Sequence, residues 1–103
     1  MASWSSRYVY TEDNVNRCVL DRGGVYTLIC QQGEEHVVFY VGQAANLRLR
    51  LRQHLSASEP NACIKSHLNT YACFFRFLVV ESPRERDRVN REQIEEYEPS
   101  CND

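Results

Sequence analysis

The sequence predicts an α+β domain in which helices flank a three-stranded antiparallel sheet. Two segments rich in β-branched and aromatic residues, 25–30 and 37–41, are separated by a short polar stretch, which is typical of a β-hairpin. A third segment of this kind, residues 72–80, follows two segments with helical patterning and precedes a charged helical segment. We therefore expect the order β-β-α-α-β-α, with helices packed over the sheet.

Length and composition indicate one globular domain. The chain has 103 residues, of which 43% are hydrophobic and 25% are charged, and both shares are ordinary for a folded protein. We expect an N-terminal tail over residues 1–10, which Trp4 or Tyr8 would anchor if it folds back, and one domain over residues 11–103. No apolar run approaches the roughly 20 residues that cross a bilayer, and residues 1–6 lack the features of a signal peptide. These observations predict a cytoplasmic protein with no membrane contact.

Cysteine usage and charge exclude some classes of protein. Five cysteines without a C-x-x-C spacing argue against a disulfide framework and a zinc knuckle, so we expect reduced, mostly buried thiols. The net charge of -2 gives no global attraction to nucleic acid, so phosphate binding would need a local cluster of cations. Lys65 is the only lysine among 12 basic residues, and arginine suits bidentate phosphate contacts better than lysine does.

Capping residues and periodicity predict the helices. Thr11, Asn46 and Ser82 each precede a segment with helical patterning, and their side chains suit the N-cap. The expected helices are a short one from Thr11 that ends at Gly23-Gly24, one from Asn46 with leucines at 47, 51 and 55, a weaker one over 60–69, and one from Ser82-Pro83 to Tyr97 that Pro99 stops.

The hairpin turn is expected near Gly33, which makes Tyr26 and Tyr40 equidistant from it. Residues opposite each other on paired strands share a face, about 5 Å apart, so the two phenols are predicted to lie side by side. Arg50 and His54 follow Leu47 by three and seven positions and thus share or border the leucine stripe of their helix. The charge of Arg50 at this position needs a partner or a cleft. The two tyrosines and His54 could instead be ordinary packing residues of the core.

Three groups of residues occur in the order and spacing of a known signature. They are Gly24-Val25-Tyr26, then Tyr40-Val41-Gly42 with Arg50 and His54, and finally Ile94, Tyr97, Pro99 and Asn102 near the end of the chain. Together they closely resemble the GIY-YIG nuclease family, over roughly residues 23–102. Each group also falls in the expected strand or helix, which is the context that such a motif requires.

The resemblance implies hydrolysis of phosphodiester bonds in DNA with one divalent cation, Mg²⁺ or Mn²⁺. In this family the tyrosine at Tyr26 activates or positions the attacking water, and the one at Tyr40 supports the site. The arginine at Arg50 contacts the scissile phosphate, and His54 matches a position often held by histidine or tyrosine. The family's asparagine at Asn102 holds the site together, and its motif glycines match Gly24 and Gly42.

One position departs from the family pattern. Counting back from Ile94 and Asn102 places the metal-binding glutamate at Asn90, where only a neutral carbonyl oxygen is available. Losing the carboxylate should weaken Mg²⁺ binding, and Asp87, one turn earlier on roughly the same face, is the acid best placed to compensate. The sequence therefore predicts an endonuclease weakened or inactivated at Asn90, with a non-catalytic DNA- or phosphate-binding module on the same fold as the alternative.

Overall fold

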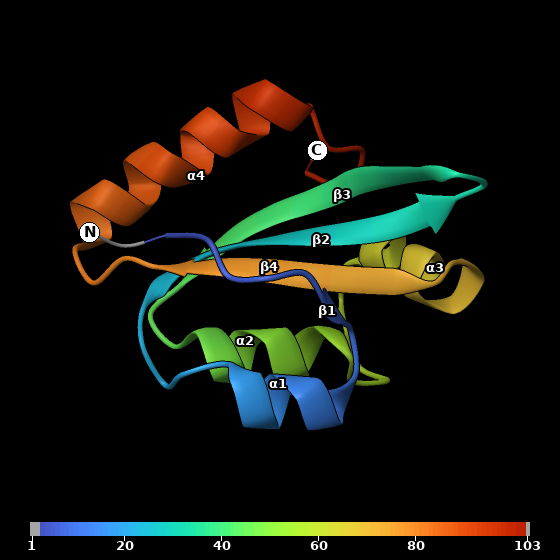
Figure 1. Cartoon of the computed structure of the whole chain (residues 1–103), viewed down its shortest axis with the longest axis horizontal. Coiled ribbons are helices and arrows are strands. Elements are labelled where there is room, and N and C mark those ends of the chain that lie inside the picture. The colour runs from blue at the N-terminus through green and yellow to red at the C-terminus, as the bar shows by residue number, and fades with distance from the viewer. Residues whose placement is uncertain (1–2, 103) are drawn as a thin grey trace.

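The computed structural model describes residues 3–102 as an α+β domain built on one antiparallel sheet. Figure 1 shows α4 on one face of the sheet and α1 and α2 on the other. The elements in chain order are β1 (Tyr8–Val9), α1 (Glu12–Cys18), β2 (Gly24–Gln32), β3 (Glu35–Ala44), α2 (Leu47–His54), α3 (Ala62–Thr70), β4 (Cys73–Val79) and α4 (Pro83–Tyr97). None of the helices in this described part of the chain is long and apolar enough to span a membrane.

The sheet has four strands rather than the predicted three, in the order β1-β4-β2-β3. The extra strand, β1, lies within the predicted tail and pairs with β4 at the edge, where Tyr8 faces Phe75. Tyr8 and Phe75 have ring centroids 5.5 Å apart, and Trp4 lies under the guanidinium of Arg76. A strand of two residues has no alternation to detect, which is why the sequence did not reveal it.

The predicted caps are confirmed. The side chains of Thr11, Asn46 and Ser82 each accept a hydrogen bond from a backbone N–H in the first turn of α1, α2 or α4. Helix α1 ends at Cys18, well before Gly23-Gly24, because Val19 is already extended (φ -103°, ψ 136°). Helix α3 starts later than expected, with Asn61 as its N-cap.

A β-bulge decides which side chains of the hairpin share a face. The turn lies at Gly33 as predicted, but the register shifts between Leu28 and Ile29, and Phe39 is the extra residue on β3. Tyr40 therefore pairs with Leu28 and Tyr26 pairs with Gly42, instead of the two tyrosines facing each other directly. Leu28 and Tyr26 lie on the same face because they are two residues apart. Without the bulge Tyr40 would project to the opposite face from Tyr26.

The main core lies between the sheet and helices α1, α2 and α3. Alternate residues of β2, Tyr26, Leu28 and Cys30, point into this core, where they join Leu47 and Leu51 of α2. The residues between them face α4, which packs on β3 and β2 without burying any of its own residues fully. Helix α2 thus meets the tyrosine face of the sheet, whereas α4 covers the other face.

A disulfide joins Cys63 of α3 to Cys101 after α4, although reduced thiols were expected. Their 38-residue separation hides the pairing from the sequence, because only the fold brings α3 and the C-terminal segment together. The expectation holds for Cys18, Cys30 and Cys73, which are free, and the last two are buried.

Candidate functional site

Tyr26 lies at the centre of the site and is fully buried. Its ring packs over Gly42 on β3, where an added Cβ would come within 2.4 Å of the tyrosine's Cζ and hydroxyl oxygen. Gly24 is restricted in the same way, because a Cβ there would lie 2.2 Å from the carbonyl oxygen of Leu78 and 2.7 Å from Leu47. Both motif glycines therefore make room for close packing around Tyr26 and α2.

Replacing Gly42 with alanine should destabilise the fold, because the new methyl group would displace a buried aromatic ring. Overpacking of this kind costs about 1–3 kcal/mol in the free energy of unfolding. Urea denaturation would measure it. Gly33→Ala is the matched control: nothing lies near its Cβ, so only its positive φ of 66° opposes alanine, at about 1 kcal/mol. An equal or smaller loss for Gly42→Ala would contradict the packing seen around Tyr26.

A buried chain of hydrogen bonds links Tyr26 to α2 and to the loop after it. The Tyr26 hydroxyl lies 2.6 Å from Nε2 of His54, and Nδ1 of His54 lies 3.0 Å from a carboxylate oxygen of Glu59. The second oxygen of Glu59 accepts a hydrogen bond from the backbone N–H of Asn61. All three side chains in the chain are buried. In the tautomer with its proton on Nδ1, His54 donates a hydrogen bond to Glu59, and Nε2 accepts one from the Tyr26 hydroxyl.

Glu59 was missed by reasoning from the sequence. It lies in the loop between α2 and α3, next to Pro60, where an acid is ordinarily exposed to solvent. No periodicity marks it, and its burial follows from the way this loop folds back beneath His54. The only sequence feature that could have suggested its contact with His54 is that the two residues lie close together along the chain.

Burial lowers the pKa of His54 and outweighs the Glu59 carboxylate, which raises it, while the charge of Arg50 lowers it further. Because the pKa is lower when the protein is folded, the unfolded chain binds more protons between that value and about 6.5. The stabilisation from neutral His54 is therefore complete above about pH 6.5 and falls as the pH falls towards the folded pKa.

We expect the free energy of unfolding lost in His54→Gln to shrink as the solution is acidified from pH 7.5 to pH 5.5. Urea denaturation of wild type and variant at each pH gives this difference directly. His36→Gln is the control, since His36 is exposed and its removal should not alter the trend. A difference that is constant or grows at low pH would contradict a buried, neutral His54.

Tyr40 and Arg50 form the accessible part of the site. Tyr40 is half-buried, with its ring centroid 6.1 Å from that of Tyr26 and 5.5 Å from that of His54. Its hydroxyl makes no hydrogen bond within the described residues 3–102. Arg50 lines a cavity of about 270 Å³ together with Glu59, Gln53 and nearby loop residues, and bonds only weakly to Gln53, at 3.3 Å.

The pKa of the buried Tyr26 phenol is shifted from its ordinary value. Burial and the neighbouring Tyr40 raise the pKa of Tyr26 well above its usual range, and Arg50 offsets this only in part. Tyr26 is therefore a neutral hydrogen-bond donor at physiological pH.

Arg50 is in no ion pair within the described part of the chain, unlike Arg88 of α4, which binds Glu85 and Glu92. Its guanidinium is available for an anion.

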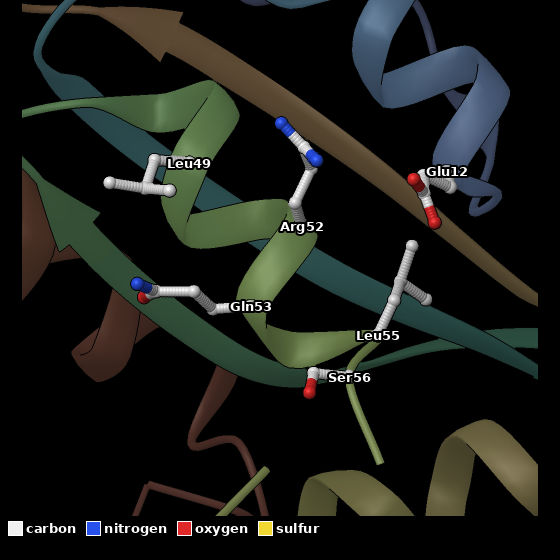
Figure 2. Close-up of a pocket in the computed structure, with 6 residues that line it drawn as sticks. All are labelled: Glu12, Leu49, Arg52, Gln53, Leu55 and Ser56. Atoms are coloured by element: carbon white, nitrogen blue, oxygen red, sulfur yellow. The ribbon is translucent and has the colours of Figure 1, made fainter. Parts of the chain in front are cut away.

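A second cavity, of about 420 Å³, lies on the outer side of α2. Figure 2 shows its lining, in which Leu55 points towards Glu12 of α1 and Gln53 lies on the other side of α2. It contains none of the predicted site residues. Because Gln53 also lines the cavity at Arg50, the two hollows flank the same helix.

Asn102 holds the C-terminal segment against β3 beside Tyr40. Its side-chain oxygen accepts the N–H of Val41 at 2.9 Å, and its side-chain nitrogen donates to the Val41 carbonyl at 2.7 Å. The preceding residue, Cys101, donates its N–H to the carbonyl of Phe39 at the bulge. These contacts fix the strand on both sides of Tyr40, in keeping with a supporting role for Asn102.

Asn90 and Asp87 lie on α4, apart from the hydrogen-bonded cluster around Tyr26. The side-chain oxygen of Asn90 is buried and has no hydrogen-bond partner. Asp87 is exposed, accepts a weak hydrogen bond from Gln43 and lies 3.6 Å from Arg91. An unpaired buried carbonyl oxygen is costly, and a hard cation would satisfy it. Asn90 therefore fits a divalent cation as a single neutral ligand.

Comparison with known proteins identifies the family to which this fold belongs. A family model for the UvrC-like GIY-YIG domain matches residues 22–102, whereas no curated protein matches the chain. The magnesium-bound GIY-YIG N-terminal endonuclease domain of UvrC from Thermotoga maritima is similar in fold, with a TM-score of 0.64 and 23% identity over 90% of this chain and 100% of that one. A point mutant of the same domain, bound to its catalytic divalent cation, has a TM-score of 0.63 at 23% identity, covering 90% and 99% of the two chains. Because the family model spans most of its length, the chain belongs to the UvrC-like GIY-YIG domain family.

Proposed function

We propose that this protein is a DNA endonuclease that hydrolyses phosphodiester bonds with Mg²⁺ or Mn²⁺, and that its activity is weakened by Asn90. One observation carries the proposal: Arg50, which is in no ion pair within residues 3–102, lines a cavity with Glu59, at the end of the buried hydrogen-bond chain from Tyr26 through His54. The ring of Tyr40 lies against the same chain, with its centroid 5.5 Å from that of His54. Membership of the family supports it. The solved relatives are described as endonuclease domains bound to a catalytic divalent cation.

Arg50 binds the scissile phosphate in this proposal. A fixed guanidinium donates two parallel hydrogen bonds to a phosphate and stabilises the negative charge that develops as the bond breaks. Its partial burial beside Glu59 and Tyr26 reduces competition from water. Arg50 therefore orients the substrate and lowers the energy of the transition state.

Tyr40 is the group that we assign to the attacking water. The family resemblance gives this role to Tyr26, but Tyr26 is fully buried and its hydroxyl is already bonded to His54. Tyr40 is only half-buried, and its hydroxyl makes no hydrogen bond within residues 3–102, so it can accept one from water. Tyr26, His54 and Glu59 then serve as the rigid support that holds Tyr40 and Arg50 in place.

The side-chain oxygen of Asn90 would hold the cation, together with water and substrate oxygens. When bound, a divalent cation polarises the phosphate and lowers the pKa of a coordinated water. A neutral amide binds Mg²⁺ less tightly than a carboxylate does, so the site would fill only at elevated concentrations of the metal. Asp87, which pairs with Arg91, is a secondary candidate that could approach the cation through water.

Incubating the purified protein with supercoiled and branched DNA, with Mg²⁺ or with a chelator, tests the proposal. We expect slow metal-dependent nicking that Tyr40→Phe abolishes without changing stability. Tyr26→Phe should instead lower the free energy of unfolding by about 1–3 kcal/mol, because it leaves Nε2 of His54 without a donor. Loss of nicking in a fully stable Tyr26→Phe, with activity kept in Tyr40→Phe, would reverse the two roles.

The alternative is a module that binds DNA without cutting it, and Asn90 is the observation that favours it. Under this alternative the same pocket holds a phosphate at Arg50, but no cation completes the site. DNA would then remain intact at every metal concentration, while binding would still weaken steeply as salt is raised. Absence of both nicking and DNA binding would exclude the two functions together.

A further inference from the structure

A cluster of two cysteines and a histidine lies apart from the proposed nuclease site. Cys63 and His67 are four residues apart on α3, so they lie on the same face of the helix, and Cys101 reaches them from the C-terminal segment. The three potential ligand atoms lie within 4.8 Å of one another. In the structure the two sulfurs form a disulfide.

We propose that, once this disulfide is reduced, Cys63, His67 and Cys101 bind a zinc-class divalent cation. A dithiol reductant would break the S–S bond by supplying two electrons and two protons, and would itself be oxidised to a disulfide. The cation then displaces the protons of both thiols and binds two thiolates and one imidazole nitrogen. Thiolate sulfur and imidazole nitrogen are ligands that zinc binds, and a water molecule would complete the tetrahedron.

The positions of the three atoms suit a tetrahedral site. Zinc–sulfur and zinc–nitrogen bonds of about 2.3 and 2.0 Å place tetrahedral ligands about 3.5 Å apart for a nitrogen and a sulfur, and about 3.8 Å apart for two sulfurs. Nδ1 of His67 lies 3.5 Å from the Cys101 sulfur and 3.9 Å from the Cys63 sulfur. Only the two sulfurs must separate, which the broken S–S bond permits.

The surroundings of His67 also favour a ligand. Its ring is stacked on Phe39, with centroids 4.7 Å apart and planes 10° from parallel, so its orientation is fixed. In the disulfide form its Nδ1 is 2.8 Å from the carbonyl oxygen of Cys63, to which it can donate a hydrogen bond. Cation binding would replace that hydrogen bond. A disulfide that only braces the fold has no need of an imidazole nitrogen converging on both of its sulfurs.

The cluster is connected to the strand that carries Tyr40. Cys101 donates its N–H to the Phe39 carbonyl at the bulge, and Asn102 is bonded twice to Val41. A cation held by Cys101 would therefore fix the same segment that the disulfide fixes. The proposal concerns a structural site and does not depend on nuclease activity.

Titration of the reduced whole protein with Co²⁺, after anaerobic removal of reductant and metal, tests this inference. We expect one equivalent of Co²⁺ to give a thiolate-to-cobalt charge-transfer absorption, which Zn²⁺ displaces. Cys101→Ser should abolish the absorption, and His67→Gln should weaken Co²⁺ binding by at least about tenfold. The disulfide form of the wild type should give no thiolate-to-cobalt absorption when Co²⁺ is added.

Cys18→Ser is the matched control, because Cys18 is a free thiol on α1 and its loss should leave the titration unchanged. Far-UV circular dichroism checks that each variant is folded. If the cysteine variant does not fold, His67→Gln still decides, since its side chain is partly exposed and can be replaced without opening the core. The inference is overturned if reduced wild type binds no Co²⁺ through thiolate, or if His67→Gln binds it as tightly.

Discussion

Replacing Asn90 with glutamate should raise Mg²⁺-dependent nicking of supercoiled DNA on the order of 100-fold. A carboxylate adds a full negative charge where the structure has one buried, unpaired carbonyl oxygen. A bound cation contributes several kcal/mol of transition-state stabilisation, and a more fully occupied site recovers part of it. Each step of about 1.4 kcal/mol changes the rate tenfold. Initial rates at a series of Mg²⁺ concentrations would measure the change, which should appear mainly at low Mg²⁺.

Asn90→Gln is the control for side-chain length, because it matches glutamate in size but stays neutral. It should not increase nicking. Thermal denaturation gives a second measurement that is independent of activity. Asn90→Glu should be less stable than the wild type in a chelator, since a partly buried charge lacks a partner, and Mg²⁺ should raise its Tm more than that of the wild type. Equal gains for Gln and Glu would contradict a cation site at Asn90.

Arg50→Ala should lower the rate of nicking by about 10²–10³-fold, the usual effect of removing one preorganised donor to a developing negative charge. Binding of DNA should weaken less than the rate falls, and its dependence on salt should decrease by about one counterion. Single-turnover nicking and binding isotherms at several salt concentrations separate the two effects. Stability should hardly change, because Arg50 is in no ion pair within residues 3–102.

Arg52→Ala controls for the general loss of positive charge on α2. Arg52 lies two residues away and lines the outer cavity of Figure 2 rather than the cavity at Arg50. Its removal should weaken binding slightly and leave the rate of nicking intact. If both variants lose activity equally, the site assigned to Arg50 is wrong and α2 contributes only diffuse charge.

Local signals predicted most of the architecture. Asn46 and Ser82 are N-caps, and the side chain of each bonds within the first turn of its own helix, so a short stretch of sequence determines the contact. Alternation in β4 likewise follows from its own residues. The presence of Arg50 and His54 on the inner side of α2 was predictable for the same reason. Helical spacing from Leu47 alone placed them beside the core.

Features that depend on distant segments were not predictable. The bulge at Phe39 is visible only once β3 is paired with β2, and it decides that Tyr40 shares a face with Tyr26. Glu59 becomes buried because its loop returns beneath His54, and Cys63 meets Cys101 because α3 lies beside the C-terminal segment. Nothing in the sequence next to these residues indicates which distant residues they contact.

A crystal structure of Tyr40→Phe in its disulfide form, bound to a short DNA duplex and Mn²⁺, would test the central claim most directly. This variant should bind DNA without cutting it, and the anomalous scattering of Mn²⁺ identifies the ion. We predict a phosphate on the guanidinium of Arg50 and an Mn²⁺ peak within coordinating distance of the side-chain oxygen of Asn90. A phosphate on Arg50 with no Mn²⁺ at Asn90 would contradict the account and leave a module that binds DNA without cleaving it.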